Sequence, residues 1–256
     1  FLIQHPEVKN VDWSSLKTVV YGASPIAQDT LEKAIEIMDC EFWQVYGLTE
    51  TNGAVTFLEP EDHDPSKNKL RSCGKPGYGA EIRIEDENGK DLAVGEVGEI
   101  VIKSDNNMKG YWNNPKATEE SVVDGWFYSG DAGYFDEDGF LYIHDRVKDM
   151  IVSGGENIYP AEVENALMSH DDILDAAVVG IPDEKWGETV KGFVVLKEGV
   201  ELKEEEIISY ARTQIAGFKC PKSINYVSEL PRNPSGKILR KDLRAPYWEG
   251  KDRNVS

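Results

Sequence analysis

Residues 18–47, TVVYGASPIAQDTLEKAIEIMDCEFWQVYG, decide the fold class of this chain. A β-rich run at 18–21 stops at Gly22, and residues 25–38 follow with apolar side chains on one face of a predicted helix. A second β-rich run at 42–47 ends in another glycine. A strand, a glycine turn, a helix and a strand in this order predict an α/β sheet, whose ligands lie beyond the carboxyl ends of its strands.

Downstream, residues 74–144 carry a different pattern, that of antiparallel strands. Residues 81–84 and 98–102 are β-rich and are separated by Asn88-Gly89, and a similar pair of runs flanks Asp138-Gly139. Asn-Gly and Asp-Gly dipeptides are turn signals between the strands of a hairpin. This part is therefore predicted to be antiparallel β.

The sequence after Asp145 mixes helices and strands. A helix is predicted to begin at Pro160, because proline is favourable at the first helical position. A second helix over 203–215 opens with three glutamates, which the helix dipole favours. Strands are predicted at residues 176–180, 192–196 and 224–227. The pattern predicts an α+β domain of about a hundred residues, a common size for an independent folding unit.

The net charge of −19, from 47 acidic and 28 basic residues, disfavours nonspecific binding to nucleic acid or anionic lipid. The acidity is uneven, since residues 212–256 hold ten basic and four acidic side chains interleaved with apolar ones. We therefore expect a folded C-terminal region with a local anion site, and no nucleic-acid partner.

Cysteine and histidine usage argues against two kinds of site. The three cysteines are far apart and odd in number, which argues against a disulfide framework and for a reducing compartment, so a cytoplasmic location is expected. The four histidines lack the spacing of a structural zinc site. No apolar run has transmembrane length and no signal peptide opens the chain, which begins at Phe1 and is expected to be a fragment.

Two motifs at predicted strand ends combine small residues with groups that bind nucleotides. In Tyr46-Gly47-Leu48-Thr49-Glu50-Thr51 the aromatic ring can stack on a purine, the Thr49 hydroxyl can bond a phosphate oxygen, and Glu50 can hold a divalent cation. In Gly22-Ala23-Ser24 the small side chains let a ligand approach the backbone closely. The alternative interpretations are a turn with a capped helix start and a simple tight turn.

Further segments carry charges with two interpretations each. Ser129-Gly130-Asp131 offers a carboxylate to a ribose diol, or it forms an Asp turn. The segment with Arg146 and Lys148 is a solvated linker, or a hinge in which Arg146 reaches a ribose or phosphate and Lys148 absorbs backbone rotation. Ser153-Gly154-Gly155 follows as a flexible turn. Lys237, after a Pro-Ser-Gly turn, is a solvated loop residue or a cation delivered to a phosphate or carboxylate.

Taken together and in this order, these segments closely resemble the adenylate-forming (AMP-binding) superfamily of acyl-CoA synthetases, nonribosomal adenylation domains and firefly luciferase. Any one segment is weak evidence, but six in register are specific. The match covers essentially all of this chain and only the C-terminal half of such an enzyme. The segments that carry the resemblance are residues 46–51, 98–102, 110–113, 129–131, 145–149 with 154–164, and the Lys237 loop.

The resemblance implies a fold of α/β and α+β parts. Residues 1–73 would be the C-terminal part of the large N-terminal domain, a remnant of its parallel-sheet subdomain that carries the nucleotide face. Residues 74–147 would be an antiparallel, β-barrel-like subdomain of the same domain. Residues 148–256 would be the small, mobile C-terminal α+β domain.

The resemblance also implies a role for each candidate residue at the nucleotide. Tyr46 would pack on the adenine, while Asp131 and Arg146 would hold the ribose. Thr49 would act at the phosphate and Glu50 at Mg²⁺. The residues expected along the nucleotide are Gly22, Ala23, Ser24, Tyr46, Gly47, Asp131 and Arg146.

For the second half of the reaction the resemblance implies a moving domain. Lys237 would bridge the substrate carboxylate and the α-phosphate during adenylation. Lys148 would be the hinge. After rotation, Ser153, Gly154 and Gly155 would border the channel for the pantetheine arm of coenzyme A.

The implied function is that of an acid–thiol ligase, an ATP-dependent acyl-CoA synthetase that makes an acyl-adenylate and then a thioester. A medium- or long-chain fatty acid is the expected substrate, with short-chain or aryl acids as alternatives. One family element is not present, the Ser/Thr/Gly-rich phosphate loop ending in Pro-Lys-Gly, which lies upstream in the family. Because leaving-group stabilisation is mostly electrostatic, this chain alone is expected not to make adenylate.

Two alternatives remain open at this point. One is a non-catalytic nucleotide-binding or interaction module on the same scaffold. The other is a luciferase-like monooxygenase or a carrier-protein-loading enzyme, which shares every motif. The expected partners are a carboxylic acid, ATP and coenzyme A, and the resemblance leaves room for peripheral membrane contact and for a homo-oligomer.

Overall fold

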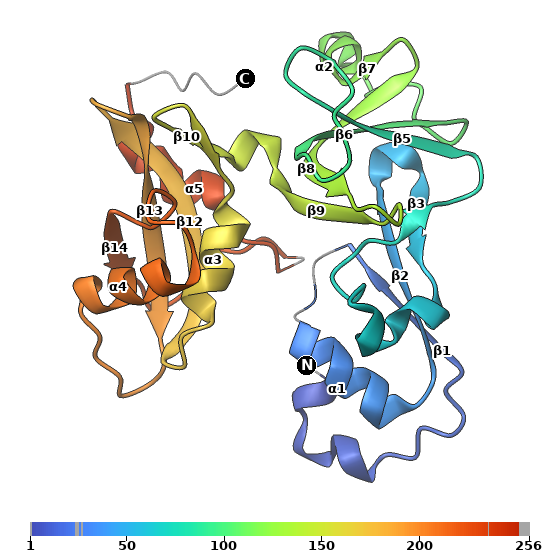
Figure 1. The fold of residues 1–256 in the computed structure, drawn as a ribbon, viewed down its shortest axis with the longest axis horizontal. Helices are drawn as coiled ribbons and strands as arrows, with labels where there is room; N and C mark the ends of the chain where they lie inside the picture. The colour runs from blue at the N-terminus through green and yellow to red at the C-terminus, as the bar shows by residue number, and fades with distance from the viewer. Residues whose placement is uncertain (1, 24–25, 27, 235, 251–256) are drawn as a thin grey trace. The chain divides into compact units, whose positions relative to one another are not determined.

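The computed structural model describes residues 2–23, 26, 28–234 and 236–250, and it divides the chain into two compact units, Phe1–Ile143 and His144–Ser256 (Figure 1). Each unit has its own hydrophobic core. The sequence-based boundary between residues 147 and 148 lies four residues further along the chain than the boundary between the units.

The first unit begins with a mixed sheet whose strand order is β1-β2-β3-β4. Its strands are β1 (Thr18–Gly22), β2 (Glu41–Leu48), β3 (Gly53–Leu58) and β4 (Lys75–Pro76). β1 and β2 are parallel and are linked by α1 (Gln28–Met38), whereas β3 and β4 are antiparallel to their neighbours. The predicted strand, helix and strand are confirmed. Because β1 and β2 are parallel, their carboxyl ends share one edge of the sheet.

The second sheet of this unit is antiparallel, as the hairpin signals predict, with the order β5-β6-β8-β7 and β9 beside β8. Its elements are β5 (Ala80–Glu85), β6 (Gly98–Ser104), α2 (Pro115–Ser121), β7 (Val122–Val123), β8 (Trp126–Phe135) and β9 (Leu141–Arg146). One buried cluster joins the two sheets, because Tyr46 and Val55 of the first pack with Ile100, Phe127 and Leu141 of the second.

The second unit is built on a five-stranded sheet with the order β11-β10-β13-β12 and β14 parallel to β13. Its strands are β10 (Ile151–Ser153), β11 (Glu156–Ile158), β12 (Ile173–Asp183), β13 (Gly187–Leu196) and β14 (Ser223–Tyr226). Its helices are α3 (Pro160–Met168), α4 (Glu204–Gln214) and α5 (Arg240–Trp248).

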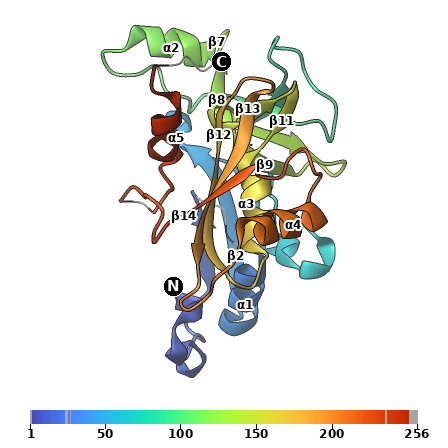
Figure 2. The same cartoon turned by 90° about the vertical axis from the view of Figure 1, so that its left-hand side faces the viewer.

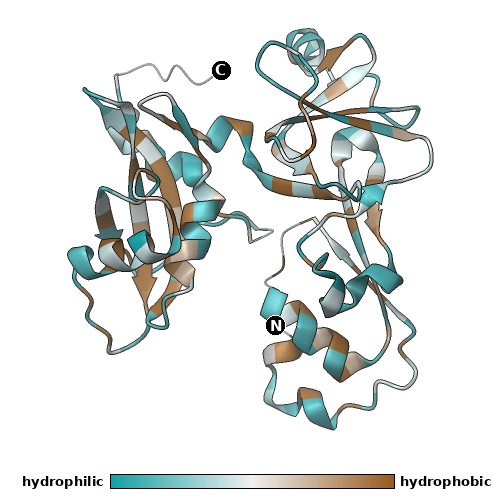
Figure 3. Ribbon diagram, viewed as in Figure 1, coloured by the Kyte–Doolittle hydropathy of each residue, from teal (hydrophilic) through white to brown (hydrophobic). Residues whose placement is uncertain are grey.

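Helices cover both faces of this sheet. Along β12, Ala176 and Val178 belong to the core shared with α3 and α4, while Ala177 and Val179 belong to the core that includes Leu243 and Tyr247 of α5. The turned view shows α3 and α4 on one side of the strands and α5 on the other (Figure 2). β12 and β13 are accordingly hydrophobic over much of their length (Figure 3), because both faces are buried.

Two elements near the candidate site residues were not predicted from the sequence. The β10–β11 hairpin contains the supposed flexible turn, with Ser153 opposite Glu156 and with Gly154 and Gly155 at φ 63° and 87°. Two central residues with positive φ define a tight hairpin turn that matches the twist of the strands. α5 directly follows the Lys237 loop.

The remaining elements are short. Single turns of 3₁₀ helix lie at Leu2–Gln4, Pro6–Asn10, Thr49–Thr51, Pro60–His63, Pro65–Lys67 and Val147–Asp149. None of the helices formed by the described residues is both long and apolar enough to cross a bilayer.

His63 is a buried titratable group of the first unit. Its Nε2 lies 3.0 Å from the Tyr21 hydroxyl and its Nδ1 lies 2.8 Å from the Glu59 carbonyl oxygen. Burial disfavours the charged imidazolium and lowers the pKa of His63 below its ordinary value of 6.5, although the Glu59 carbonyl opposes the shift.

We expect the stability of the first unit to fall as the pH decreases below about 6.5, because the unfolded chain then binds a proton that folded His63 does not. Thermal unfolding of the wild type and of His63→Gln between pH 7.5 and 5.5 tests this. The variant should lose less stability on acidification than the wild type, and comparing the two cancels the groups common to both. Equal pH dependence in the two proteins would contradict the expectation.

Candidate active site

The carboxyl ends of β1 and β2 form the first part of the candidate site. Gly22 lies opposite Val45, and a Cβ atom at Gly22 would come within 2.2 Å of the Val45 carbonyl oxygen, so only glycine fits this strand pair. Ala23 follows in the left-handed region at φ 62° and is exposed. Such backbone is uncommon outside glycine and is often found at functional sites. Ser24, also expected at the nucleotide, lies outside the described residues.

The buried pair of Tyr46 and Asp131 joins the two sheets of the first unit. The Tyr46 hydroxyl donates to Asp131 Oδ2 at 2.9 Å, and both residues are 7% exposed. Burial, followed by the negative charge of Asp131, raises the pKa of Tyr46 far above its ordinary value, so the hydroxyl remains a donor. Ser129 Oγ accepts from the Asp131 amide at 3.1 Å and fixes the strand around the carboxylate.

The Tyr46 ring itself lies in the core cluster with Val55 and Ile100. A purine could therefore contact at most a small part of its surface without movement of its neighbours. Adenine packing on Tyr46 stays a prediction. The structure shows a second role for Tyr46, because its hydroxyl donates a hydrogen bond to Asp131. The sequence gives no direct signal of this bond, because 85 residues separate the partners.

The turn after β2 presents Thr49 and Glu50. Thr51 Oγ1 accepts from the Leu48 amide at 2.9 Å and lies 2.7 Å from the Gly53 carbonyl oxygen, which closes the turn. Thr49 is exposed and Glu50 is partly buried. The Tyr111 hydroxyl donates to Glu50 Oε1 at 2.8 Å, so the Gly110-Tyr111-Trp112-Asn113 motif, which had no assigned role, supports this carboxylate.

Glu50 could contribute one oxygen ligand to a magnesium ion whose other ligands are substrate phosphates and water. Within the described ranges no group of three or more histidine, cysteine, aspartate or glutamate side chains could hold a metal ion. Mg²⁺ is usually bound by one or two carboxylates together with substrate phosphates and water. A single partly buried glutamate fits that pattern.

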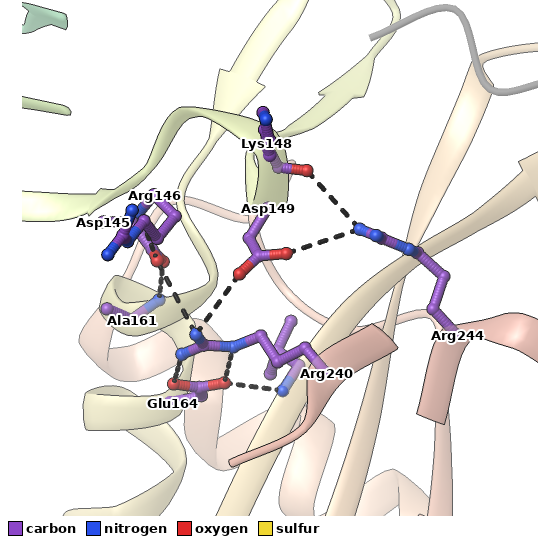
Figure 4. A network of polar contacts seen from close by, with 9 residues as sticks. Asp145, Arg146, Lys148, Asp149, Ala161, Glu164, Arg240 and Arg244 are labelled. Carbon is purple, nitrogen blue, oxygen red and sulfur yellow. Dashed lines mark hydrogen bonds and ion pairs between the residues drawn. The ribbon is translucent and has the colours of Figure 1, made fainter. Parts of the chain in front are cut away.

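The second unit carries the residues expected at the hinge. Arg146 and Lys148 are exposed, and Lys148 lies in the 3₁₀ turn Val147–Asp149. The Lys148 carbonyl oxygen accepts from Arg244 Nη1 at 3.4 Å (Figure 4). Asp145 beside them is buried, and burial raises its pKa while the charge of Arg240 opposes the rise.

The glycine turn of the β10–β11 hairpin lies against Trp186. The Gly154 amide donates to the Trp186 carbonyl oxygen at 2.8 Å, and a Cβ atom at Gly154 would come within 2.7 Å of the indole ring. Gly154 and Gly155 are exposed and Ser153 is partly so. The turn therefore exposes its backbone beside the Trp186 side chain.

Lys237 lies on a loop held by backbone and side-chain hydrogen bonds. Its amide donates to Asn233 Oδ1 at 2.9 Å, and its carbonyl oxygen accepts from the Asn233 amide at 2.9 Å. Arg232 spans the loop, donating to the Gly236 carbonyl oxygen and to Asp175 Oδ2, both at 2.6 Å. The Lys237 side chain is exposed, and Ser235, two residues before it, lies outside the described residues.

The candidate residues thus fall into two sets. The first unit holds Gly22, Ala23, Tyr46, Gly47, Thr49, Glu50 and Asp131. The second unit holds Arg146, Lys148, Ser153, Gly154, Gly155 and Lys237. Their roles toward ligands stay predictions.

Comparison with known proteins identifies the class. The family model of the AMP-binding enzyme matches residues 1–112, and that of the AMP-binding enzyme C-terminal domain matches residues 162–237. A fatty acid–[acyl-carrier-protein] ligase of Streptomyces coeruleorubidus is 42% identical over 255 residues, which cover 100% of this chain and 49% of that protein. A feruloyl-CoA synthase of an Amycolatopsis species is 42% identical over 243 residues, which cover 95% of this chain and 49% of that protein.

Among solved structures, o-succinylbenzoate coenzyme A synthetase from Bacillus subtilis in complex with ATP and magnesium ion has a TM-score of 0.80 at 40% identity. That match covers 90% of this chain and 46% of the other. The chain therefore belongs to the AMP-binding enzyme family, as its motifs predicted. It spans about half the length of the curated relatives it matches.

Tyr46→Phe should destabilise the first unit by about 1–3 kcal/mol, the cost of depriving a buried polar group of a hydrogen-bond partner. Tyr78→Phe is the matched control, because Tyr78 is fully exposed, and it should change stability by less than about 0.5 kcal/mol. Chemical denaturation followed by fluorescence measures both. If the two variants were equally stable, the bond to Asp131 would not hold the sheets together.

Proposed function

We propose that this chain is the nucleotide-handling part of an ATP-dependent acyl ligase. A carboxylate and ATP would form an acyl-adenylate and pyrophosphate, and a thiol would then displace AMP to give a thioester. The observation that carries the proposal is the 42% identity with an acyl ligase over 255 residues of this chain.

In the first step, the nucleotide would lie at the carboxyl ends of β1 and β2. The Asp131 carboxylate would accept hydrogen bonds from the ribose, with Arg146 as a second contact. The Tyr46 hydroxyl, which donates to Asp131 Oδ2, would hold the carboxylate in place for these bonds. Thr49 would donate to a phosphate oxygen and Glu50 would hold Mg²⁺, which would neutralise part of the phosphate charge when bound.

Lys237 would supply the charge that the adenylation step needs. The substrate carboxylate and the α-phosphate are both anionic, and they repel each other as they approach bonding distance. One ammonium group between them offsets this repulsion, and the effect is large where water is excluded. The two hydrogen bonds between Asn233 and the Lys237 backbone support the role, because a fixed backbone reduces the entropy lost when the ammonium group binds.

In the second step, the Ser153-Gly154-Gly155 turn would line the channel through which the thiol of the pantetheine arm reaches the acyl-adenylate. Because one small domain would present Lys237 first and this turn second, it would rotate between the steps, with Lys148 as the hinge. Glycines with positive φ leave backbone groups open to a narrow ligand such as a pantetheine arm.

The acid and the acceptor are proposed from the relatives. We favour a medium- or long-chain fatty acid as the substrate and coenzyme A as the acceptor. The names of the compared proteins include a fatty acid, a feruloyl group and o-succinylbenzoate as the acyl part. One of these names gives an acyl-carrier protein as the acceptor. The free thiols of Cys40, Cys73 and Cys220 are compatible with the cytoplasm, the expected location.

Lys237→Ala should lower the adenylation rate by roughly 10²-fold or more in the polypeptide extended upstream to the length of its relatives. The assay is ATP–pyrophosphate exchange with a panel of fatty and aryl acids. Lys241→Ala, an exposed lysine in the first turn of α5, is the control and should retain the exchange rate. A near wild-type rate in Lys237→Ala would remove the lysine from the mechanism.

The alternative is a non-catalytic nucleotide-binding module on the same scaffold. Pyrophosphate exchange by this chain and by the upstream-extended polypeptide separates the two. Exchange in the extended form supports the ligase. AMP binding without exchange in either form supports the binding module.

A further inference from the structure

Arg240 gathers three carboxylates that come from both sides of the proposed hinge. Its guanidinium binds Glu164 in a bidentate manner, with Nε–Oε1 and Nη2–Oε2 distances of 3.0 and 2.6 Å. Its Nη1 lies 3.8 Å from Asp145 Oδ1 and 3.7 Å from Asp149 Oδ2 (Figure 4). Asp145 precedes Lys148 in the chain, whereas Asp149, Glu164 and Arg240 follow it.

Asp145 makes a second contact across the same point. Its Oδ2 accepts from the Ala161 amide at 2.7 Å, in the first turn of α3, where the helix dipole also favours a negative charge. Its Oδ1 accepts from the Arg146 amide at 2.7 Å. Asp145 is 8% exposed, and a buried carboxylate is stable only with such partners.

The other contacts of Asp149 and Glu164 lie wholly on the downstream side of Lys148. Arg244 Nη1 is 3.4 Å from Asp149 Oδ1, and Glu164 Oε1 accepts from the Val178 amide at 2.8 Å. Rotation of the backbone at Lys148 would leave these contacts intact, because both partners move together. The same rotation would separate Asp145 from Ala161 and Arg240.

We propose that Asp145 is a positioning residue, a latch that holds the C-terminal unit in one of its two working orientations and is released when the backbone turns at Lys148. This inference rests on the proposed function for its second orientation. The latch also explains why the units divide at Ile143 and His144, upstream of Lys148, since Asp145 is tied to α3 and α5 of the second unit. In the released orientation, Asp145 would belong with the first unit.

The kinetic test separates the two half-reactions in the upstream-extended enzyme. Asp145→Ala should change the ratio of the adenylation rate to the rate of thioester formation from preformed acyl-adenylate by about fivefold or more, the lower end of coupling between two states. Glu164→Gln is the matched control, because it removes a buried charge from the same arginine without crossing the hinge. It should change both rates by a common factor. An unchanged ratio in Asp145→Ala, or an equal change of ratio in both variants, would overturn the proposal.

A second measurement needs no catalytic activity. Hydrogen exchange on the 256-residue chain should show faster exchange in Asp145→Ala at the amides of Arg146 and Ala161, with α4 and β12–β14 still protected. Faster exchange throughout the second unit would mean that Asp145 stabilises the whole unit. Unchanged exchange would mean that Asp145 does not fix the segment around Lys148. Either result would overturn the latch. If local exchange rises as expected but the extended enzyme forms no acyl-adenylate, the contact stands and the proposed function fails.

Discussion

The hydrogen bond from the Tyr46 hydroxyl to the Asp131 carboxylate is the contact on which the candidate site depends. It ties the end of β2 in the first sheet to β8 in the second, and it does so where burial makes an unpaired carboxylate costly. Because the parallel pair β1 and β2 ends at the same edge, Gly22 and Ala23 are collected at the same edge as Tyr46. This bond and the surrounding hydrophobic cluster thus join the mixed sheet to the antiparallel sheet near the edge where we propose that the nucleotide lies.

The second unit combines a well-packed core with a polar network near its first residues. Its sheet is buried on both faces by α3, α4 and α5, and the Lys237 loop is fixed by Arg232 and Asn233. The polar network around Arg240 ties α3 and α5 to the segment that includes Lys148. Polar contacts of this kind are compatible with the rotation that we propose at Lys148, because they can be made and broken without exposing a hydrophobic core.

Local patterns predicted much of the fold, and their failures have physical causes. The strand, helix and strand of residues 18–47 and the hairpins around Asn88 and Asp138 follow from periodicity and turn chemistry, which act over a few residues. α5 was not predicted from the sequence. It contains Pro246 and many charged residues, so the helical spacing of its apolar positions, Leu243 and Tyr247, is hard to recognise. The bonds of Tyr46 to Asp131 and of Glu50 to Tyr111 join residues 85 and 61 positions apart, a separation at which no local pattern is informative.

The most direct measurement is a crystal structure of the upstream-extended enzyme with a non-reactive acyl-adenylate analogue. We expect the ribose hydroxyls within about 3.2 Å of the Asp131 carboxylate, with the bond from Tyr46 retained and the adenine beside Gly22 and Ala23. An analogue bound elsewhere, with the surroundings of Asp131 unchanged from those of the unliganded protein, would contradict the assignment of this edge as the nucleotide site.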